Sequence, residues 1–226
     1  MRILMISDLH YSTKPFHGLD ESKSFEWLYK VIENEKPELT ISAGDFGLEA
    51  DSYLFEPILE KTYLLTVYGN HDNIGLIKSL KNEDGSRCWL QDGVIREYDG
   101  LRIAGISGNI AELKRKPHHK TEAEIKQIIS SYSGKRTDIL ITHEAPEHES
   151  ISRGRMLGYR VINEAIKEIK PKLHLCGHVH LKSQILNFDE TISVNLDSSA
   201  RRREYCLAEA TDGKIRNIKI KSYRRK

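Results

Sequence analysis

Five short apolar runs of this chain each end at side chains that bind metal ions well. The five polar segments are Ser7-Asp8-Leu9-His10, Gly44-Asp45, Gly69-Asn70-His71-Asp72, Thr142-His143-Glu144 and Gly177-His178-Val179-His180. Each segment alone is typical of an ordinary surface turn, but together they hold five of the ten histidines of the chain. A short apolar run between polar residues is typical of a buried strand. The pattern therefore predicts strands whose ends carry polar groups.

Strands and amphipathic helices are predicted to alternate over the first three-quarters of the chain. The predicted strands are 3–7, 39–43, 63–68, 94–98, 101–106, 138–142 and 173–176, and the predicted helices are 24–34, 52–60, 74–80, 121–131 and 161–169. Asp99-Gly100 is a strong hairpin signal between two of these strands. Thr121 and Glu124 have the spacing of a capping box at the start of a helix. Such alternation indicates an α/β fold with a mainly parallel sheet.

The last quarter of the chain has a different pattern. Four further strands are predicted at 183–188, 191–195, 204–209 and 214–221. Tight turns at Asp189-Glu190 and Asp212-Gly213 join them, so we expect an added antiparallel sheet. No linker or internal repeat separates the two parts, and we therefore expect one domain over residues 1–226.

Each of the five polar segments comes directly after a predicted strand. In open α/β sheets, ligands bind in the crevice at the carboxyl ends of the strands. Residues that lie far apart in the sequence are then brought to one edge. This placement predicts a single site that combines all five segments.

Composition limits the class of protein. The chain has 226 residues, of which 38% are hydrophobic and 30% charged, as expected for a globular protein. No apolar run reaches the length of a membrane span, and the first residues lack the pattern of a signal peptide. The three cysteines, Cys88, Cys176 and Cys206, have no paired spacing. We therefore expect a cytoplasmic protein with reduced thiols and no membrane partner.

The types of ligand indicate the kind of metal site. A structural zinc site has four ligands and usually includes cysteine, whereas no cysteine lies in the candidate positions. Seven candidate ligands are also too many for one tetrahedral ion. Mixed carboxylate, amide and imidazole ligands suit ions such as manganese, iron or zinc. Two ions about 3.5–4 Å apart that share a carboxylate would form a clamp for hydrolysis.

In combination and in this order, the motifs D-x-H, G-D, G-N-H-D, H and G-H-x-H resemble those of the calcineurin-like metallophosphoesterases. The match extends from Asp8 to His180, most of the chain. The resemblance implies a four-layer α/β/β/α sandwich with two mixed central sheets. It also implies two divalent metal ions, with manganese favoured and iron, zinc or nickel as alternatives.

The same resemblance implies a role for each motif residue. Asp8, His10 and His180 would bind the first metal, Asn70, His143 and His178 the second, and Asp45 would bridge the two. His71 would protonate the departing oxygen, and Asp72 would orient the His71 imidazole. A hydroxide held between the metals would attack a phosphodiester or phosphomonoester.

Two segments between the motifs are candidates for choosing the substrate. The first, 107–120, contains the basic cluster Lys114-Arg115-Lys116. The second, 146–159, contains Arg153 and Arg155, which suit bidentate binding of a phosphate. An ordinary surface loop is the alternative interpretation of both segments.

Three functions fit these motifs. We favour a phosphoesterase for a small, nucleotide-like phosphate ester. A nuclease is the alternative, because residues 201–226 carry ten Lys/Arg against three Asp/Glu and this basic tail is suited to nucleic acid. A non-catalytic scaffold on the same fold is less favoured, because every ligand position is filled. The motifs leave the oligomeric state open, with a homodimer among the alternatives.

Overall fold

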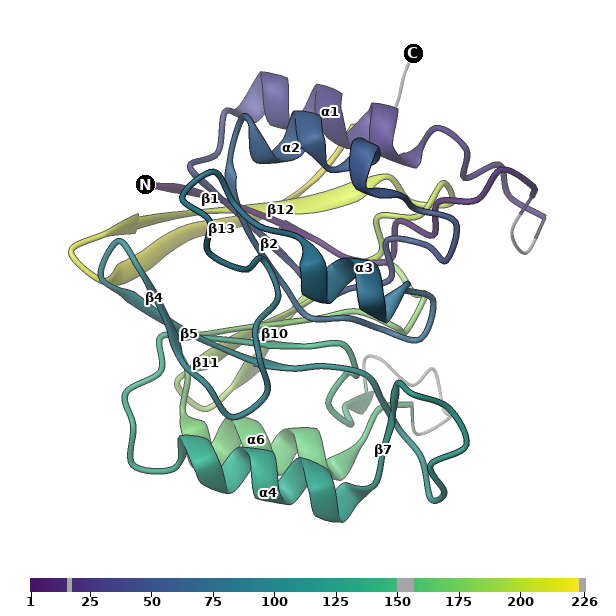
Figure 1. Ribbon diagram of the computed structural model, residues 1–226. Coiled ribbons are helices and arrows are strands. Elements are labelled where there is room, and N and C mark those ends of the chain that lie inside the picture. The colour runs from purple at the N-terminus through teal and green to yellow at the C-terminus, as the bar shows by residue number, and fades with distance from the viewer. Residues whose placement is uncertain (16–17, 150–156, 224–226) are drawn as a thin grey trace.

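Two mixed β-sheets lie face to face, and helices cover the outer side of each sheet, as Figure 1 shows. This computed structural model describes residues 1–15, 18–149 and 157–223. The layers follow the order helix, sheet, sheet, helix, so the predicted four-layer sandwich is confirmed.

The first sheet has the strand order β13-β12-β1-β2-β3. Its strands are β1 (Arg2–Ile6), β2 (Leu39–Ser42), β3 (Tyr63–Thr66), β12 (Glu204–Thr211) and β13 (Lys214–Ser222). Strands β1, β2 and β3 are parallel, whereas β12 and β13 run antiparallel to their neighbours.

The second sheet has the order β10-β11-β9-β8-β5-β4. Its strands are β4 (Arg96–Tyr98), β5 (Leu101–Ile106), β8 (Ile139–Thr142), β9 (Leu173–Cys176), β10 (Gln184–Phe188) and β11 (Thr191–Asn195). Strands β5, β8, β9 and β11 are parallel. The predicted hairpin at Asp99-Gly100 is confirmed, because β4 and β5 pair antiparallel on either side of it. A short parallel pair, β6 (Asn109–Ile110) and β7 (His119–Lys120), was not predicted.

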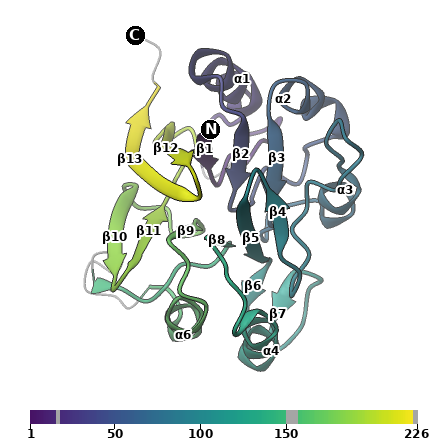
Figure 2. The ribbon, with the colours of Figure 1, turned by 90° about the vertical axis from the view of Figure 1, so that its left-hand side faces the viewer.

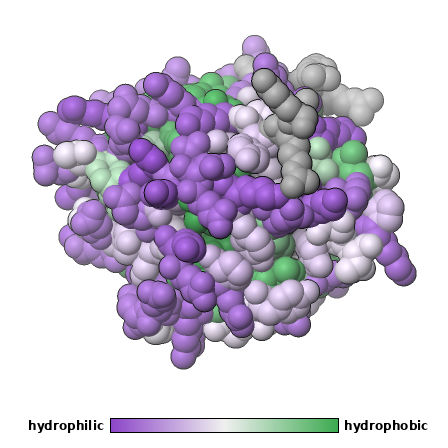
Figure 3. Space-filling model, turned by 90° about the horizontal axis from the view of Figure 1, so that it is seen from above, coloured by the Kyte–Doolittle hydropathy of each residue, from purple (hydrophilic) through white to green (hydrophobic). Residues whose placement is uncertain are grey.

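Alternation along the strands builds three apolar layers. Ile3 and Met5 of β1 pack between the two sheets, whereas Leu4 and Ile6 pack against the helices of the first sheet. Those helices are α1 (Ser24–Glu35), α2 (Glu56–Leu59) and α3 (Ile74–Ser79). Helices α4 (Glu122–Tyr132) and α6 (Arg160–Ile169) cover the second sheet (Figure 2). The outer surface on the α1 side is mostly hydrophilic (Figure 3).

Helix α4 begins at the predicted capping box, whereas the helix predicted at 52–60 is divided in two. The capping box is confirmed, because the Thr121 hydroxyl accepts from the Glu124 N–H and the Glu124 carboxylate accepts from the Thr121 N–H. The single helix predicted at 52–60 is instead a 3-10 turn, η1 (Ser52–Leu54), followed by α2. Pro57 lies in the first turn of α2 and has no N–H to continue an earlier helix.

The added antiparallel sheet predicted for the C-terminal strands is wrong. Strands β10 and β11 extend the second sheet beside β9, whereas β12 and β13 extend the first sheet beside β1. The apolar side chains on both faces of β12 explain why this strand joins the first sheet. Its Cys206 and Ala208 pack between the sheets, while Tyr205 and Leu207 pack on the helix side. A strand that is apolar on both faces needs cover on both, and the sandwich supplies it.

Candidate metal centre

Loops from both sheets meet at one edge of the sandwich. The loops after β1 and β2 are joined by hydrogen bonds from Asp8 N to Gly44 O and from His10 N to Asp45 O, both 2.9 Å long. The loops after β8 and β9 are joined by a bond of 3.2 Å from Gly177 N to His143 O. Between the sheets, the N–H of His178 donates to both carboxylate oxygens of Asp8, at 3.2 and 3.0 Å. The carboxyl ends of these four strands therefore form one continuous site.

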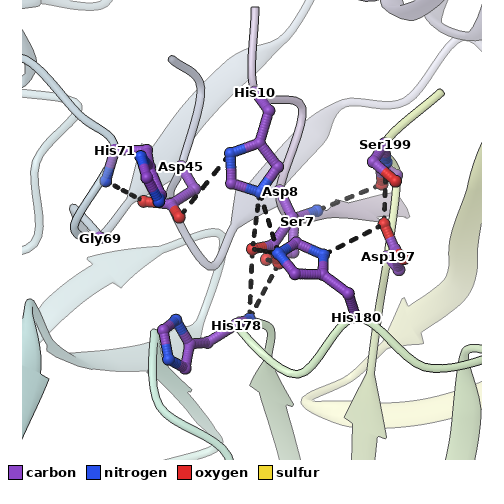
Figure 4. A network of polar contacts seen from close by, with 12 residues as sticks. Ser7, Asp8, His10, Asp45, Gly69, His71, His178, His180, Asp197 and Ser199 are labelled. Carbon is purple, nitrogen blue, oxygen red and sulfur yellow. Dashed lines mark hydrogen bonds and ion pairs between the residues drawn. The ribbon is translucent and has the colours of Figure 1, made fainter. Parts of the chain in front are cut away.

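Asp8, His10 and His180 form the first ligand group (Figure 4). Asp8 Oδ1 lies 3.5 Å from His10 Nε2 and 3.9 Å from His180 Nε2, and the two imidazole nitrogens lie 3.2 Å apart. Ligand atoms bound at about 2.1 Å to one ion lie about 3.0–3.4 Å apart. The three atoms are therefore arranged closely enough to share an ion.

Asp45, His143 and His178 form the second group. Asn70 belongs to it, because its Oδ1 lies 3.1 Å from His143 Nε2. His143 is fully buried, and its Nδ1 lies 2.8 Å from Ala43 O, where it can only donate. The proton is therefore on Nδ1, and the lone pair of Nε2 faces the site. Burial also lowers the pKa of His143 to about 3, so this imidazole is neutral.

Asp45 lies between the two groups. Its Oδ2 is 3.5 Å from His143 Nε2 and 3.9 Å from His10 Nδ1. This oxygen is buried and accepts no hydrogen bond from the residues that the structure describes. Burial, reinforced by the negative charges of Asp72 and Asp8, raises the pKa of Asp45 well above its usual range. A buried carboxylate oxygen that lies beside the lone pair of His143 Nε2 fits a cation.

The two aspartates of the ligand groups differ in their electrostatics. Burial raises the pKa of Asp8, but a hydrogen bond from His10 and the charges of His180 and His10 outweigh it. The net effect is a pKa below the usual range. Asp8 is therefore held ionised by the histidines around it, whereas Asp45 needs a further positive charge.

Strained backbone and close packing place these ligands. Asp8, His10, Asp45 and His178 all have positive φ, at 58°, 51°, 58° and 64°. Non-glycine residues rarely adopt this conformation, and in proteins it concentrates at functional sites. A Cβ at Gly69 would lie 2.1 Å from Asp45 Oδ1 and 2.4 Å from His143 Cε1. Glycine at this position of the G-N-H-D motif is thus a requirement of the packing around the ligands.

Asp72 holds the loop that carries Asp45. One of its oxygens accepts from the N–H groups of Asp45 and Gly69, at 2.7 and 2.8 Å, and the other accepts from Phe46 N–H at 2.7 Å. The structure therefore assigns to Asp72 the positioning of Asp45. Its suggested contact with the His71 imidazole stays a prediction.

His71 lies beside the first ligand group. Its ring centroid is 5.2 Å from that of His10, and its backbone N–H donates to Asp45 Oδ1 at 2.7 Å. A cavity of about 120 Å³ opens next to it, with His10, Tyr11, Leu48 and Glu49 in its walls. His71 is thus close to the ligands and borders space that a substrate can enter.

Of the two predicted substrate segments, the structure describes the basic residues of the first but not the two arginines of the second. Arg153 and Arg155 lie outside the described residues, so their predicted contact with phosphate stays a prediction. In the segment 107–120, Lys114 pairs with Glu124 at 2.7 Å and Lys120 with Asp92 at 3.1 Å. These two ammonium groups hold the loop against the rest of the chain.

Two acidic residues next to the ligands were not assigned a role from the sequence. Glu144 follows His143 directly, and Asp197 follows β11, so both obey the strand-end rule that located the ligands. Glu144 is 3% exposed and Asp197 is fully buried. Glu144 lies near His178 and Asp197 near His180.

Comparison with known proteins gives a family and a fold. A family model described as calcineurin-like phosphoesterase matches residues 1–182. No curated protein matches the chain. Among the described residues, no helix is long and apolar enough to cross a membrane.

Several solved structures have the same fold. TT1561 of Thermus thermophilus is similar with a TM-score of 0.71 at 14% identity, and the match covers 98% of each chain. A hypothetical protein from the same organism has a TM-score of 0.60 at 11% identity, again over 98% of each chain. GAP50, the anchor in the inner membrane complex of Plasmodium, has a TM-score of 0.54 at 16% identity over 92% of this chain and 80% of that one.

At such identities the likeness shows the fold alone. The family model, in contrast, covers most of the chain and includes all five polar segments that meet in the site. The chain belongs to the calcineurin-like phosphoesterase family.

Proposed function

We propose that the protein hydrolyses phosphate esters with two bound divalent ions. The observation that carries this proposal is the position of Asp45 Oδ2, a buried oxygen between two groups of ligand atoms. A shared carboxylate between two ions is the arrangement of two-metal hydrolases. When bound, such ions lower the pKa of a water molecule to about 7 and neutralise the negative charge of the phosphate.

The residues of the chain supply the rest of the chemistry. Asp45, held by Asp72, carries its carboxylate between the two groups. His71 borders the open cavity and is placed to donate a proton to the departing oxygen. Proton donation by a positioned side chain contributes about 10²- to 10⁴-fold when the leaving group is a poor one.

The ligands favour manganese among the candidate ions. Both groups combine carboxylate with imidazole, and the second group adds the amide oxygen of Asn70. The described part of the chain has three free cysteines, all buried, and none belongs to a ligand group. Without thiolate ligands, the site suits manganese, with iron, zinc and nickel as alternatives.

The cavity beside His71 supports a small substrate. Its volume of about 120 Å³ fits a compact group, and Leu48 at its rim is 61% exposed. The Glu49 carboxylate accepts from the N–H and hydroxyl of Thr13, at 2.7 and 2.6 Å, so its charge is fixed at the same rim. An apolar wall and a negative charge favour a leaving group with an apolar face and disfavour a second phosphate.

Leu48→Ala is expected to lower kcat/KM for aryl phosphate esters by about 10-fold. The change removes apolar area that would contact the leaving group, at about 25 cal/mol per Å². The measurement is steady-state kinetics on a series of esters whose leaving groups increase in size.

Leu113→Ala is the matched control, because Leu113 is also 61% exposed but lies in the segment 107–120. Equal kinetics of wild type and Leu48→Ala on every ester would contradict a leaving-group role for this cavity. A loss in Leu113→Ala alone would move the leaving group to the other segment.

A nuclease is the second candidate, because of the basic residues after residue 200. Two of them have partners within the chain: Arg203 lies 3.5 Å from Glu21, and Lys221 lies 3.0 Å from Glu35. Lys214, Arg216, Lys219 and Lys221 lie on the edge strand β13, where basic side chains prevent pairing with other sheets. Both observations favour a smaller substrate.

The salt dependence of binding separates these two candidates. For a small-ester phosphoesterase we expect weak binding of a DNA or RNA oligonucleotide. A nuclease that uses the basic residues would instead show an affinity that falls steeply with salt, since each phosphate contact releases a counterion. A slope of several units in log K against log [salt] would favour the nuclease.

The experiment that tests the proposed function is a substrate panel with several divalent ions. The panel contains aryl and alkyl monoesters, diesters, cyclic nucleotides and oligonucleotides, each assayed with manganese, iron, zinc and nickel. We expect turnover that requires metal and two ions bound per chain. A protein that binds no ion and turns over no ester would instead favour a scaffold on the same fold.

A further inference from the structure

Two buried carboxylates lie behind the two histidines of the segment Gly177-His178-Val179-His180. Asp197 is next to His180, and Glu144 is next to His178. Each therefore lies beside a histidine of a different ligand group.

Asp197 faces the side of His180 that points away from the ligands. Its Oδ1 lies 3.7 Å from His180 Nδ1, whereas His180 Nε2 faces Asp8 and His10 (Figure 4). The carboxylate is itself fixed, because Oδ1 accepts from Ser199 N–H at 3.0 Å and the Asp197 N–H donates to Ser183 Oγ at 3.0 Å.

Glu144 lies behind a histidine of the second ligand group, as Asp197 does in the first. Its Oε2 lies 3.8 Å from His178 Nε2, which leaves Nδ1 of that ring for the ligand group. The other oxygen, Oε1, accepts from Ile110 N–H at 3.2 Å. The strand β6 therefore holds Glu144 in place.

Both carboxylates have an oxygen that the fold alone leaves unsatisfied. Asp197 Oδ2 and Glu144 Oε2 are buried and accept no hydrogen bond from the described residues. In Glu144 this oxygen is the one that faces His178, whereas in Asp197 the other oxygen, Oδ1, faces His180. A buried carboxylate is costly unless a positive group faces it. The N–H of an imidazole whose other nitrogen binds a cation is such a group. A carboxylate at one ring nitrogen also keeps the proton there and leaves the lone pair of the other nitrogen for the metal.

We propose that Asp197 and Glu144 are positioning residues, each of which sets the tautomer and orientation of one metal-binding histidine. Asp197 acts on the first metal site through His180, and Glu144 acts on the second through His178. This inference rests on the proposed two-metal function. It adds that the metal affinities of the two sites are controlled separately, by carboxylates that act through the histidine ligands.

The test measures metal affinity at one site at a time. His10→Ala removes a ligand of the first group and leaves the second to be measured, and Asn70→Ala does the reverse. Asp197→Asn and Glu144→Gln are made in both backgrounds, and Mn²⁺ binding is followed by titration calorimetry. Both changes keep the size of the side chain and remove its charge.

The expected result is a crossover. In the Asn70→Ala background, Asp197→Asn weakens Mn²⁺ binding by about 10- to 100-fold while Glu144→Gln has little effect. In the His10→Ala background, only Glu144→Gln weakens binding. Loss of a contact that merely supports the fold would weaken both sites together or neither.

Asp138→Asn controls for the loss of any buried carboxylate. Asp138 is fully buried and pairs with Lys172 at 2.9 Å, but it precedes β8, at the opposite end of the strand from His143. Its removal is expected to lower thermal stability and leave both Mn²⁺ affinities unchanged. If Asp197→Asn does not fold, Asp197→Ser replaces it, since serine retains an acceptor for Ser199 N–H.

Two outcomes overturn the inference, and they are distinguishable. If the wild type binds two ions and the charge-removing variants bind them equally well, the positioning roles are wrong and the two-metal proposal stands. If the wild type binds no divalent ion, the proposed function and this inference fail together.

Discussion

Asp45→Asn is expected to abolish turnover, with a fall in kcat of at least about a thousandfold. Asp45 Oδ2 is the oxygen that lies between the two ligand groups, and an amide in its place carries no charge to hold two cations. Loss of one preorganised electrostatic contact already costs about 10²- to 10³-fold, and this change weakens both metal sites. The measurement is kcat on an aryl diester, together with metal content by elemental analysis.

The same substitution is expected to stabilise the metal-free protein. Burial and the charges of Asp72 and Asp8 raise the pKa of Asp45, so an ionised Asp45 destabilises the fold when no cation is present. Asparagine removes that charge and keeps an oxygen for His71 N–H. A higher Tm of the variant in chelator, with a lower Tm than wild type in manganese, is the expected pair of results. Full activity of the variant at saturating metal would overturn the role of Asp45.

His71→Ala is expected to retain both metal ions and lose rate on esters with poor leaving groups. The ring borders the cavity but belongs to neither ligand group. Removal of a general acid costs about 10²- to 10⁴-fold. An alkoxide needs the proton, whereas p-nitrophenolate leaves without it. The measurement is kcat for alkyl and p-nitrophenyl esters of the same phosphate, so each substrate is the control for the other.

The comparison of leaving groups separates proton donation from substrate binding. A loss that is equally large for both esters would show that His71 binds the phosphate and does not protonate the leaving oxygen. A loss of metal from His71→Ala would overturn the separation between His71 and the ligands. Unchanged rates on both esters would remove His71 from the reaction.

The ligand groups could be predicted because each motif is local. Asp8 and His10 share one loop, as do His178 and His180, and each loop follows an apolar run that can be recognised as a strand. The carboxyl ends of parallel strands lie at one edge whatever the details of packing. The strand ends therefore predicted one shared site, the resemblance to the calcineurin-like metallophosphoesterases implied the pairing of Asp8 with His180, and the structure places their ligand atoms 3.9 Å apart.

Other features depended on contacts that no local pattern records. The role of Asp72 is an example, because its carboxylate accepts from the backbone of a loop that lies more than twenty residues earlier. The placement of β12 is another example. Its two apolar faces need cover on both sides, and only the packed helices and second sheet show where that cover lies.

The sequence alone indicated the candidate ligands, the strands that carry them and the hydrolytic chemistry that they suit. These depend on short-range patterns, namely apolar periodicity and the spacing of polar groups at strand ends. Tertiary structure alone decided that Asp72 holds the loop of Asp45 and that Asp197 and Glu144 lie behind the histidines. Distances between loops of different sheets arise from packing of the whole sandwich, and packing is a property of all the side chains together.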